Sequence, residues 1–204
     1  MNNPDLIKLA ISKGAVVMAS ISGGKDGQAM VNVLAAEEVP IAGLIHADLG
    51  SVEWPESMAQ CQKQAARYSL PLHVVRRTDT NRDPIKMFLL KYNFIISAEG
   101  IRGEESTARA KKIPLEIRWE ITSTYYKDMT VEEAIAAFNP AYRLALTWFP
   151  IFGYTLQEVW ATEGMTMDMV FRARMQYKNN LVVPKWWPFH PAYAYGNERV
   201  NCMF

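Results

Sequence analysis

Short apolar runs alternate with amphipathic runs along the first half of the chain. The apolar runs predict strands at 15–19, 41–47, 72–75 and 94–98. Apolar residues at helical spacing predict helices at 28–37 and 56–68. Asp83-Pro84 predicts the start of a third helix, because proline in a first turn lacks an N–H that the helix does not need. Such alternation is typical of βαβ units and a parallel sheet.

The pattern is less regular beyond residue 110. Residues 113–119 predict a strand or hairpin arm, and 142–149 are rich in β-forming aromatic residues. Thr155 followed by Glu158 predicts a capped helix at 155–162. From Leu181 onward we expect irregular structure over the core. The fold class predicted is α/β, an open, mostly parallel twisted sheet with helices on both faces, Rossmann-like, with a partly irregular helical C-terminal segment.

Composition narrows the class of protein. The chain has 204 residues, half of them hydrophobic, and a formal net charge of +1, which is typical of a globular protein and gives no indication of a nucleic-acid partner. No apolar run reaches the roughly 18 to 20 residues that cross a bilayer, so we expect a soluble, cytoplasmic protein without a membrane partner. Two cysteines and three histidines, widely spaced, make no complete zinc or iron–sulfur ligand set.

The segment Ser20-Ile21-Ser22-Gly23-Gly24-Lys25-Asp26-Gly27 joins the first strand to the first helix. Gly23 and Gly24 lack a Cβ, so the backbone can turn sharply and direct several N–H groups at one point. The positive end of the following helix adds to their field, and phosphate or sulfate is the expected ligand. The alternative is an ordinary strand-to-helix turn, in which Gly, Ser and Asp serve conformation and capping.

Two further polar clusters follow predicted strands, His46-Ala47-Asp48 and Gly100-Ile101-Arg102. Because ligand groups gather at the carboxyl ends of strands in an open sheet, we expect these clusters and the glycine loop to share one crevice. Asp48 suits a divalent cation, although a cap or a solvated carboxylate is an equal alternative. Lys25 is suited to contact phosphate, and Asp26 is suited to cap or orient the loop.

Arg102 and Arg109 flank a Glu-Glu-Ser turn. Guanidinium groups suit phosphate or sulfate oxygens. The competing explanation is internal pairing with Glu99, Glu104 or Glu105, which would account for one of the two arginines. Arg102 is the stronger candidate for ligand contact.

The ordered set of these motifs resembles the PAPS (phosphoadenosine phosphosulfate) reductase family of the PP-loop superfamily. The loop is similar to that superfamily's S-G-G-x-D-S, with Gly27 where serine is usual, so one phosphate-contacting hydroxyl is missing. Residues 46–56 are similar to its H-x-D-T-G and proline-glutamate stretch, 100–109 to G-x-R-x-x-E-S-x-x-R, and 150–160 to P-I-x-x-W/Y-T-x-x-D/E-V-W. The matches span roughly residues 14 to 162.

The resemblance implies a PP-loop ATPase type of fold, with 1–162 as the nucleotide-binding domain and 163–204 as a C-terminal segment packing on it. It implies an adenine nucleotide, ATP or PAPS, as cofactor, with Mg²⁺ on Asp48 if the nucleotide is ATP. Lys25, Asp48 and Arg102 are the expected catalytic residues. The expected nucleotide-binding residues are Ser20, Ser22, Gly23, Gly24, Lys25, Asp26, Gly27, His46, Asp48, Gly100, Arg102 and Arg109.

Three functions fit these residues. In the first, an acceptor attacks the α-phosphorus of ATP, giving AMP and pyrophosphate by way of an adenylylated intermediate. The second is a thiol-dependent reductase, but the reductases' Glu-Cys-Gly-Leu-His segment is absent, which leaves Cys61 and Cys202 as the thiols. The third is a nucleotide-binding protein without chemistry, which Gly27 and the missing segment favour. The acceptor, a nucleic acid included, and homo-oligomerisation stay open.

Overall fold

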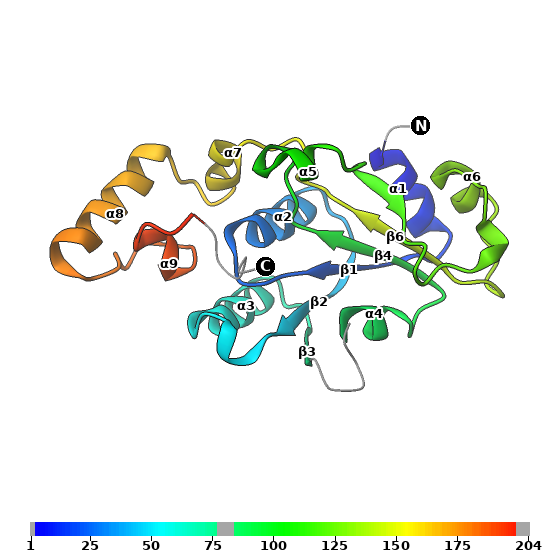
Figure 1. Cartoon of the computed structure of the whole chain (residues 1–204), viewed down its shortest axis with the longest axis horizontal. Coiled ribbons are helices and arrows are strands. Elements are labelled where there is room, and N and C mark those ends of the chain that lie inside the picture. The colour runs from blue at the N-terminus through cyan, green and yellow to red at the C-terminus, as the bar shows by residue number, and fades with distance from the viewer. Residues whose placement is uncertain (1–2, 77–83, 199–204) are drawn as a thin grey trace.

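The computed structural model describes residues 3–76 and 84–198, and these residues form a six-stranded sheet (Figure 1). The strand order is β3-β2-β1-β4-β6-β5, and all neighbours are parallel except β5 and β6. The strands are β1 (Val16–Ser20), β2 (Ile41–Asp48), β3 (Leu72–Arg76), β4 (Phe94–Glu99), β5 (Leu115–Ile117) and β6 (Leu144–Trp148). The prediction of an α/β fold with a mostly parallel sheet is confirmed.

The helices are α1 (Asn3–Ser12), α2 (Lys25–Ala36), α3 (Glu56–Arg67), α4 (Pro84–Leu89), α5 (Thr107–Ala110), α6 (Val131–Ala136), α7 (Leu156–Ala161), α8 (Met167–Asn180) and α9 (Pro191–Ala194). Short 3-10 helices lie at Gly50–Val52, Gly103–Glu105 and Thr124–Tyr126. Helix α2 begins at Lys25, three residues before the predicted start, because Gly24 is its N-cap. Thr155 and Glu158 form the expected capping box. Helix α4 begins at Pro84, and Asp83 lies outside the described residues.

Alternation along the strands sends side chains to two faces of the sheet. In β1, Val17 and Ala19 join a core cluster that includes residues of α1, α2 and α3. Met18, between them, joins a second cluster with Phe88 and Leu89 of α4. The sheet therefore has an α3 face, which α1, α2 and α6 also cover, and an α4 face.

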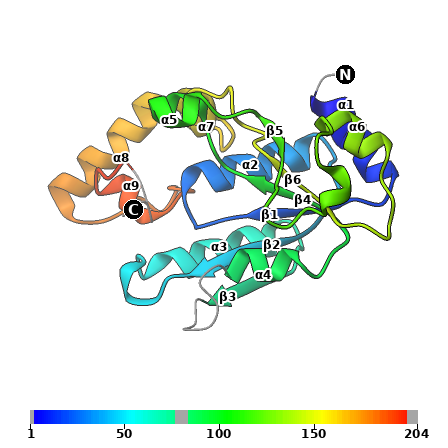
Figure 2. The same ribbon diagram turned by 45° about the vertical axis from the view of Figure 1, so that its right-hand side comes forward.

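The C-terminal region has an apolar cluster of its own. Trp160 of α7 contacts the rings of Trp187, Phe189 and Tyr193, and Val170 and Ala173 of α8 join them. Helices α8 and α9 lie at one end of the molecule, away from α1 and α6 (Figures 1 and 2). No helix in the described part of the chain is long and apolar enough to span a membrane.

Candidate anion and nucleotide site

The glycine loop connects β1 to α2 through a backbone that requires glycine at position 23. Gly23 has φ +74°, in the left-handed region, and a Cβ there would lie 2.8 Å from the Ser57 carbonyl oxygen. Gly24 caps α2 without a side-chain hydrogen bond to the helix. The first N–H groups of a helix of 12 residues thus face the end of β1, which is the arrangement that binds anions.

The end of β4 packs directly against this loop. A Cβ on Gly100 would come within 2.7 Å of the backbone of Asp26 and Gly27. Gly100 is therefore next to the loop, as the sequence predicted, and its role is to let two backbone segments approach. Arg102, two residues after Gly100, lies beside the same loop.

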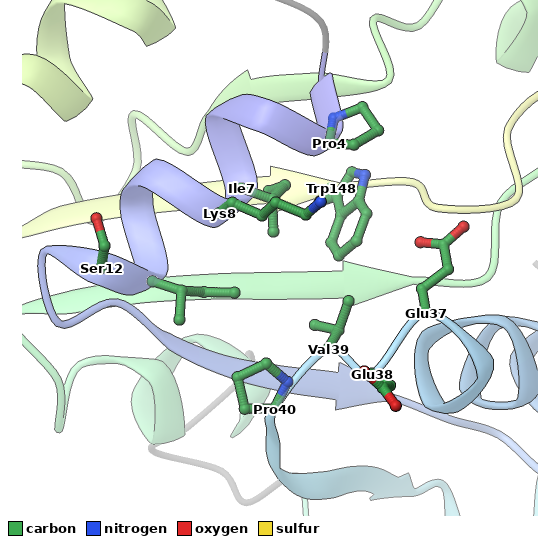
Figure 3. Close-up of a pocket in the computed structure, with 10 residues that line it drawn as sticks. Pro4, Ile7, Lys8, Ser12, Glu37, Glu38, Val39, Pro40 and Trp148 are labelled. Carbon is green, nitrogen blue, oxygen red and sulfur yellow. The ribbon is translucent and has the colours of Figure 1, made fainter.

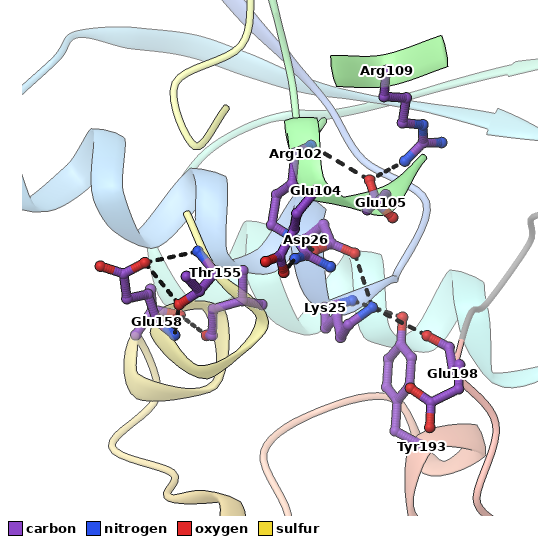
Figure 4. Close-up of polar contacts among 12 residues, drawn as sticks. Lys25, Asp26, Arg102, Glu104, Glu105, Arg109, Thr155, Glu158, Tyr193 and Glu198 are labelled. Carbon is purple, nitrogen blue, oxygen red and sulfur yellow. Dashed lines mark hydrogen bonds and ion pairs between the residues drawn. The ribbon is translucent and has the colours of Figure 1, made fainter. Parts of the chain in front are cut away.

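Lys25, Asp26 and Arg102 form a buried charge cluster (Figure 4). Asp26 accepts a hydrogen bond from Lys25 Nζ at 3.0 Å and another from Arg102 Nε at 2.6 Å. Lys25 and Arg102 are only 3% and 4% exposed. Arg102 also pairs with Glu104, and we call these four residues the Asp26 cluster. Both cations expected to bind a ligand thus converge beside the loop, with Asp26 as their shared partner.

Internal pairing accounts for both arginines, where the sequence suggested that it would account for one. Arg109 pairs with Glu105 of the preceding 3-10 helix, four residues earlier in the chain, and within the described residues this is its ion pair. Glu99 pairs with neither arginine of this segment. Its partner is Arg118, at 3.3 Å.

Tyr193 of α9 is a site residue that sequence reasoning missed. Its hydroxyl accepts the Lys25 N–H at 3.0 Å, and its ring lies 5.1 Å from Lys25 Nζ. The same ammonium donates to the Glu198 carbonyl oxygen at 3.1 Å. The C-terminal segment therefore accepts hydrogen bonds from both the backbone N–H and the side-chain ammonium of Lys25, the first residue of α2. Nothing in the local sequence could indicate a partner 168 positions away.

His46 and Asp48 lie on the α3 face, because alternation from Leu44 places them there. His46 is fully buried, and its Nδ1 donates to the Ile21 carbonyl oxygen at 3.2 Å. Its Nε2 lies 3.3 Å from a Glu53 oxygen. His46 therefore supports the loop backbone from beneath and is not directed at a ligand in the crevice.

Asp48 is engaged at both carboxylate oxygens. One oxygen accepts the Gly50 N–H at 2.8 Å and the other accepts from Arg76 Nε at 2.7 Å. These two bonds, the Gly50 bond above all, hold the pKa of Asp48 below its usual value. The structure does not bring Asp48 to Lys25 or Arg102, which departs from the expectation of one shared crevice. The described residues contain no group of three His, Cys, Asp or Glu side chains that could hold a metal ion.

A pocket of about 380 Å³ lies where the strand order reverses between β1 and β4. Such a switch point is the usual ligand position of an open α/β sheet. The pocket is lined by residues at strand ends, by residues that directly follow strands, and by one residue of α4: Ser20, Ile21, Ser22, Ala47, Leu49, Ile85, Glu99 and Arg118. The Ser20 hydroxyl is buried there and makes no hydrogen bond within the described residues. Glu99 and Arg118, which sequence reasoning did not assign to the site, form one wall.

Cys61 is the one cysteine within the described residues, and it is fully buried in α3. Burial, with a contribution from Glu53, raises the pKa of its thiol to about 12. Cys61 is therefore a protonated thiol at neutral pH and does not supply a nucleophile. Cys202 lies outside the described residues.

A larger cavity of about 490 Å³ lies between α1 and the segment after α2 (Figure 3). It is at the opposite end of α2 from the loop. Its walls are mostly apolar, and Lys8 is its one cation, with Glu37 and Glu38 also in the lining. Two carboxylates against one cation make this cavity unfavourable for a phosphate.

Comparison with solved structures shows a fold shared with one of them. PAPS reductase from Candida auris, solved as a phosphate complex, aligns over 98% of this chain and 87% of its own, with a TM-score of 0.55 and 12% identity. Yeast FAD synthetase in complex with FAD aligns over 78% of this chain and 56% of its own, with a TM-score of 0.45 and 16% identity. No protein-family model matches the chain, and no curated protein matches its sequence.

Proposed function

Starting from a chain that has the fold of PAPS reductase, we propose that it binds an adenine nucleotide, ATP or PAPS, with the phosphates or sulfonate on residues 22–27. The observation that carries the proposal is the switch-point pocket, which begins at Ser20–Ser22 and so adjoins the start of α2. The nucleoside would occupy this pocket, beside the Ser20 hydroxyl, which has no partner among the residues that the structure describes. The polyanionic end would face the loop amides.

For ATP, we propose cleavage at the α-phosphate. An acceptor attacks the α-phosphorus, the bond to the bridging oxygen breaks, and pyrophosphate leaves. Lys25 and Arg102 would stabilise the departing charge, because both lie beside the loop. A polyphosphate carries more charge than the single Asp26 carboxylate that these cations now share, so it can compete for them.

Asp48 fits Mg²⁺ only as a single ligand. Mg²⁺ commonly takes one or two protein carboxylates and completes its shell with phosphate oxygens and water. Asp48 would have to release Arg76, whose side chain is 77% exposed and therefore replaceable. When bound, Mg²⁺ would neutralise phosphate charge. The residues at the loop perform their roles independently of it.

Two observations bear on the alternatives. A thiol-dependent reductase would depend on Cys202, since the Cys61 thiol is buried and protonated. A protein that binds without chemistry is favoured by Tyr193, which holds the Lys25 amide, and by the absence of a hydroxyl at Gly27. Both alternatives keep the same nucleotide pocket.

The test is calorimetric titration with ATP, PAPS and AMP, followed by assay for AMP, pyrophosphate and sulfite. We expect K25M to weaken binding of the polyphosphate at least about tenfold, the effect of losing one charge-assisted contact. K8M, in α1 and beside the C-terminal end of α2, is the matched control and should bind normally. Loss of sulfite release in C202S would favour the reductase. Binding of a nucleotide without formation of any product would favour the binding protein without chemistry. Absence of binding to any of the nucleotides would overturn the proposal.

A further inference from the structure

A second polar cavity lies beside the switch-point pocket on the same edge of the sheet. It has a volume of about 330 Å³, and Glu99 and Arg118 line both cavities. This ion pair, with its 3.3 Å contact, is thus a wall between two compartments. The first compartment lies over the ends of β2, β1 and β4. The second is lined from β5 and β6, where Glu116 and Thr147 lie opposite each other in the register.

Strand alternation shows that both cavities open on one face. Ser20 follows Met18, Glu99 follows Ile95, and Thr147 follows Ala145, each by an even number of residues along its strand. Met18, Ile95 and Ala145 all belong to the cluster on the α4 face. A ligand in the second cavity would therefore lie on the same side of the sheet as a nucleoside in the first.

Charges of both signs line the second cavity. Lys112 and Arg118 are positive, whereas Glu116 and Glu120 are negative. Within the described residues, the charged groups of Lys112, Glu116 and Glu120 make no hydrogen bond or ion pair, although the Lys112 ammonium lies 5.1 Å from the centre of the Phe149 ring. A ligand can therefore pair with these charges. Trp119 adds an apolar surface that is 51% exposed. The volume is at the small end of the range for ligand pockets, roughly 300–1,000 Å³.

We infer that this second cavity binds the acceptor of the proposed reaction and that the acceptor is a free α-amino acid. The inference rests on the proposed cleavage of ATP. Lys112 and Arg118 match a carboxylate, Glu116 and Glu120 match an ammonium group, and Trp119 can contact a side chain. A dicarboxylate without an amine would face two unpaired glutamates, and a diamine without a carboxylate would face an unpaired lysine.

The reaction step that this arrangement allows needs no general base. A carboxylate oxygen of the amino acid attacks the α-phosphorus and forms an O–P bond. The bond from the α-phosphorus to the bridging oxygen breaks, and its electron pair leaves with pyrophosphate. The attacking carboxylate carries no proton at neutral pH, so none has to be removed. The product is an aminoacyl adenylate, a mixed anhydride that a second nucleophile can cleave.

The experiment is exchange of labelled pyrophosphate into ATP, measured with the full-length protein and a mixture of the standard amino acids, then with each one singly. We expect exchange that depends on one amino acid or a small group of them. We expect K112E to lower kcat/KM for the amino acid about tenfold or more while ATP affinity, measured by calorimetry, changes less than about twofold. K111E is the matched control, because Lys111 is the exposed neighbour and lines neither cavity.

A second variant separates the ammonium contact from the rest. E116Q should raise KM for the amino acid about tenfold and leave KM for its des-amino analogue unchanged, because only the ammonium loses a charged partner. ATP binding without amino-acid-dependent exchange would overturn this inference and leave the proposed nucleotide site intact. Exchange that K112E and E116Q leave at the level of K111E would overturn it as well. Failure to bind ATP at all would instead overturn the proposed function.

Discussion

Two polar clusters flank the first half of α2, and they differ in what their charges face. The Asp26 cluster lies at the start of the helix and holds two cations beside the glycine loop. The second, which we call the Glu163 network, consists of Gln28, Asn32, Gln60, Arg67 and Glu163. There Glu163 accepts from Gln28 and Asn32, both at 2.7 Å, and from Arg67 at 2.6 Å.

The difference separates a binding site from a structural joint. In the Asp26 cluster one carboxylate is shared by two cations next to helix N–H groups, so an incoming anion can replace it as their partner. In the Glu163 network, neutral amides from α2 surround a carboxylate from the C-terminal region, and Gln60 of α3 reaches the Pro188 carbonyl at 3.1 Å. These contacts attach the C-terminal region to the sheet domain. Perturbing the first should change binding, and perturbing the second should change stability.

The largest effect is expected from E163A. Removing the carboxylate takes the nearest acceptor from the amides of Gln28 and Asn32 and leaves them only the longer bonds to Pro188 and Thr162. We expect a cost of about 3 kcal/mol in the free energy of unfolding, because Arg67 loses its charged partner as well. Urea denaturation measures it. E158A, which removes the carboxylate of an exposed helix cap, is the control and should cost clearly less. Equal losses in the two variants would show that the network is not a joint.

Acid should weaken the same joint. Burial would raise the pKa of Glu163, but the hydrogen bonds from Arg67, Gln28 and Asn32 outweigh it and lower the pKa. A lowered pKa contributes stability that is present above the unfolded value of 4.5 and lost as pH falls through the folded value. We expect the urea concentration at the midpoint of unfolding to decrease at pH values below 4.5. In E163Q that part of the pH dependence should be missing, and a profile identical to the parent chain would contradict the assignment.

Substitution of Gly23 should affect both binding and stability. In G23A the new Cβ meets the Ser57 carbonyl oxygen in a left-handed backbone, which should cost about 2 kcal/mol and displace the loop amides. Phosphate affinity and thermal unfolding measure the two consequences. G153A is the control, because a Cβ there meets nothing within 4 Å. Retained phosphate binding in G23A would argue against the loop as the anion site.

Removing one hydroxyl should move binding and stability in opposite directions. Y193F deletes the acceptor of the Lys25 N–H, at a cost of about 1 kcal/mol in unfolding free energy. The freed N–H becomes available to an anion, so phosphate affinity should rise. Y195F, on the same segment, should leave the affinity unchanged. A weaker affinity in Y193F would mean that the hydroxyl assists the anion instead of competing with it.

The smallest effect is expected from G27S. A Cβ at position 27 has its nearest neighbours in Ile21 at 3.6 Å, an ordinary contact, so serine fits. Replacing glycine in the first turn of α2 should add up to about 0.5 kcal/mol of stability. The added hydroxyl should also strengthen phosphate binding by a few-fold. G27A supplies the helix gain alone, so equal affinities in G27S and G27A would show that the hydroxyl does not reach the anion.

The sequence predicted the α/β class, the glycine loop between β1 and α2, and the approach of Gly100 and Arg102 to that loop. These depend on periodicity and on short-range rules, since the carboxyl ends of parallel strands meet at one edge. The sequence placed Asp48 with them. In the structure Asp48 lies on the α3 face, which α2 also covers, but its two carboxylate oxygens are bound by Gly50 and Arg76. The face was not predictable, because the side that a given strand residue takes depends on which helices cover each face.

What the amino-acid order determined by itself is the backbone: where strands stop, where helices start, and where only glycine allows the chain to turn. Tertiary structure alone decided which side chains share the resulting space. It placed Tyr193 on the Lys25 amide, Glu163 among the amides of α2, and Arg118 against Glu99. These pairings join residues far apart in the chain, and their energy depends on distance and burial, which no local pattern of residues encodes.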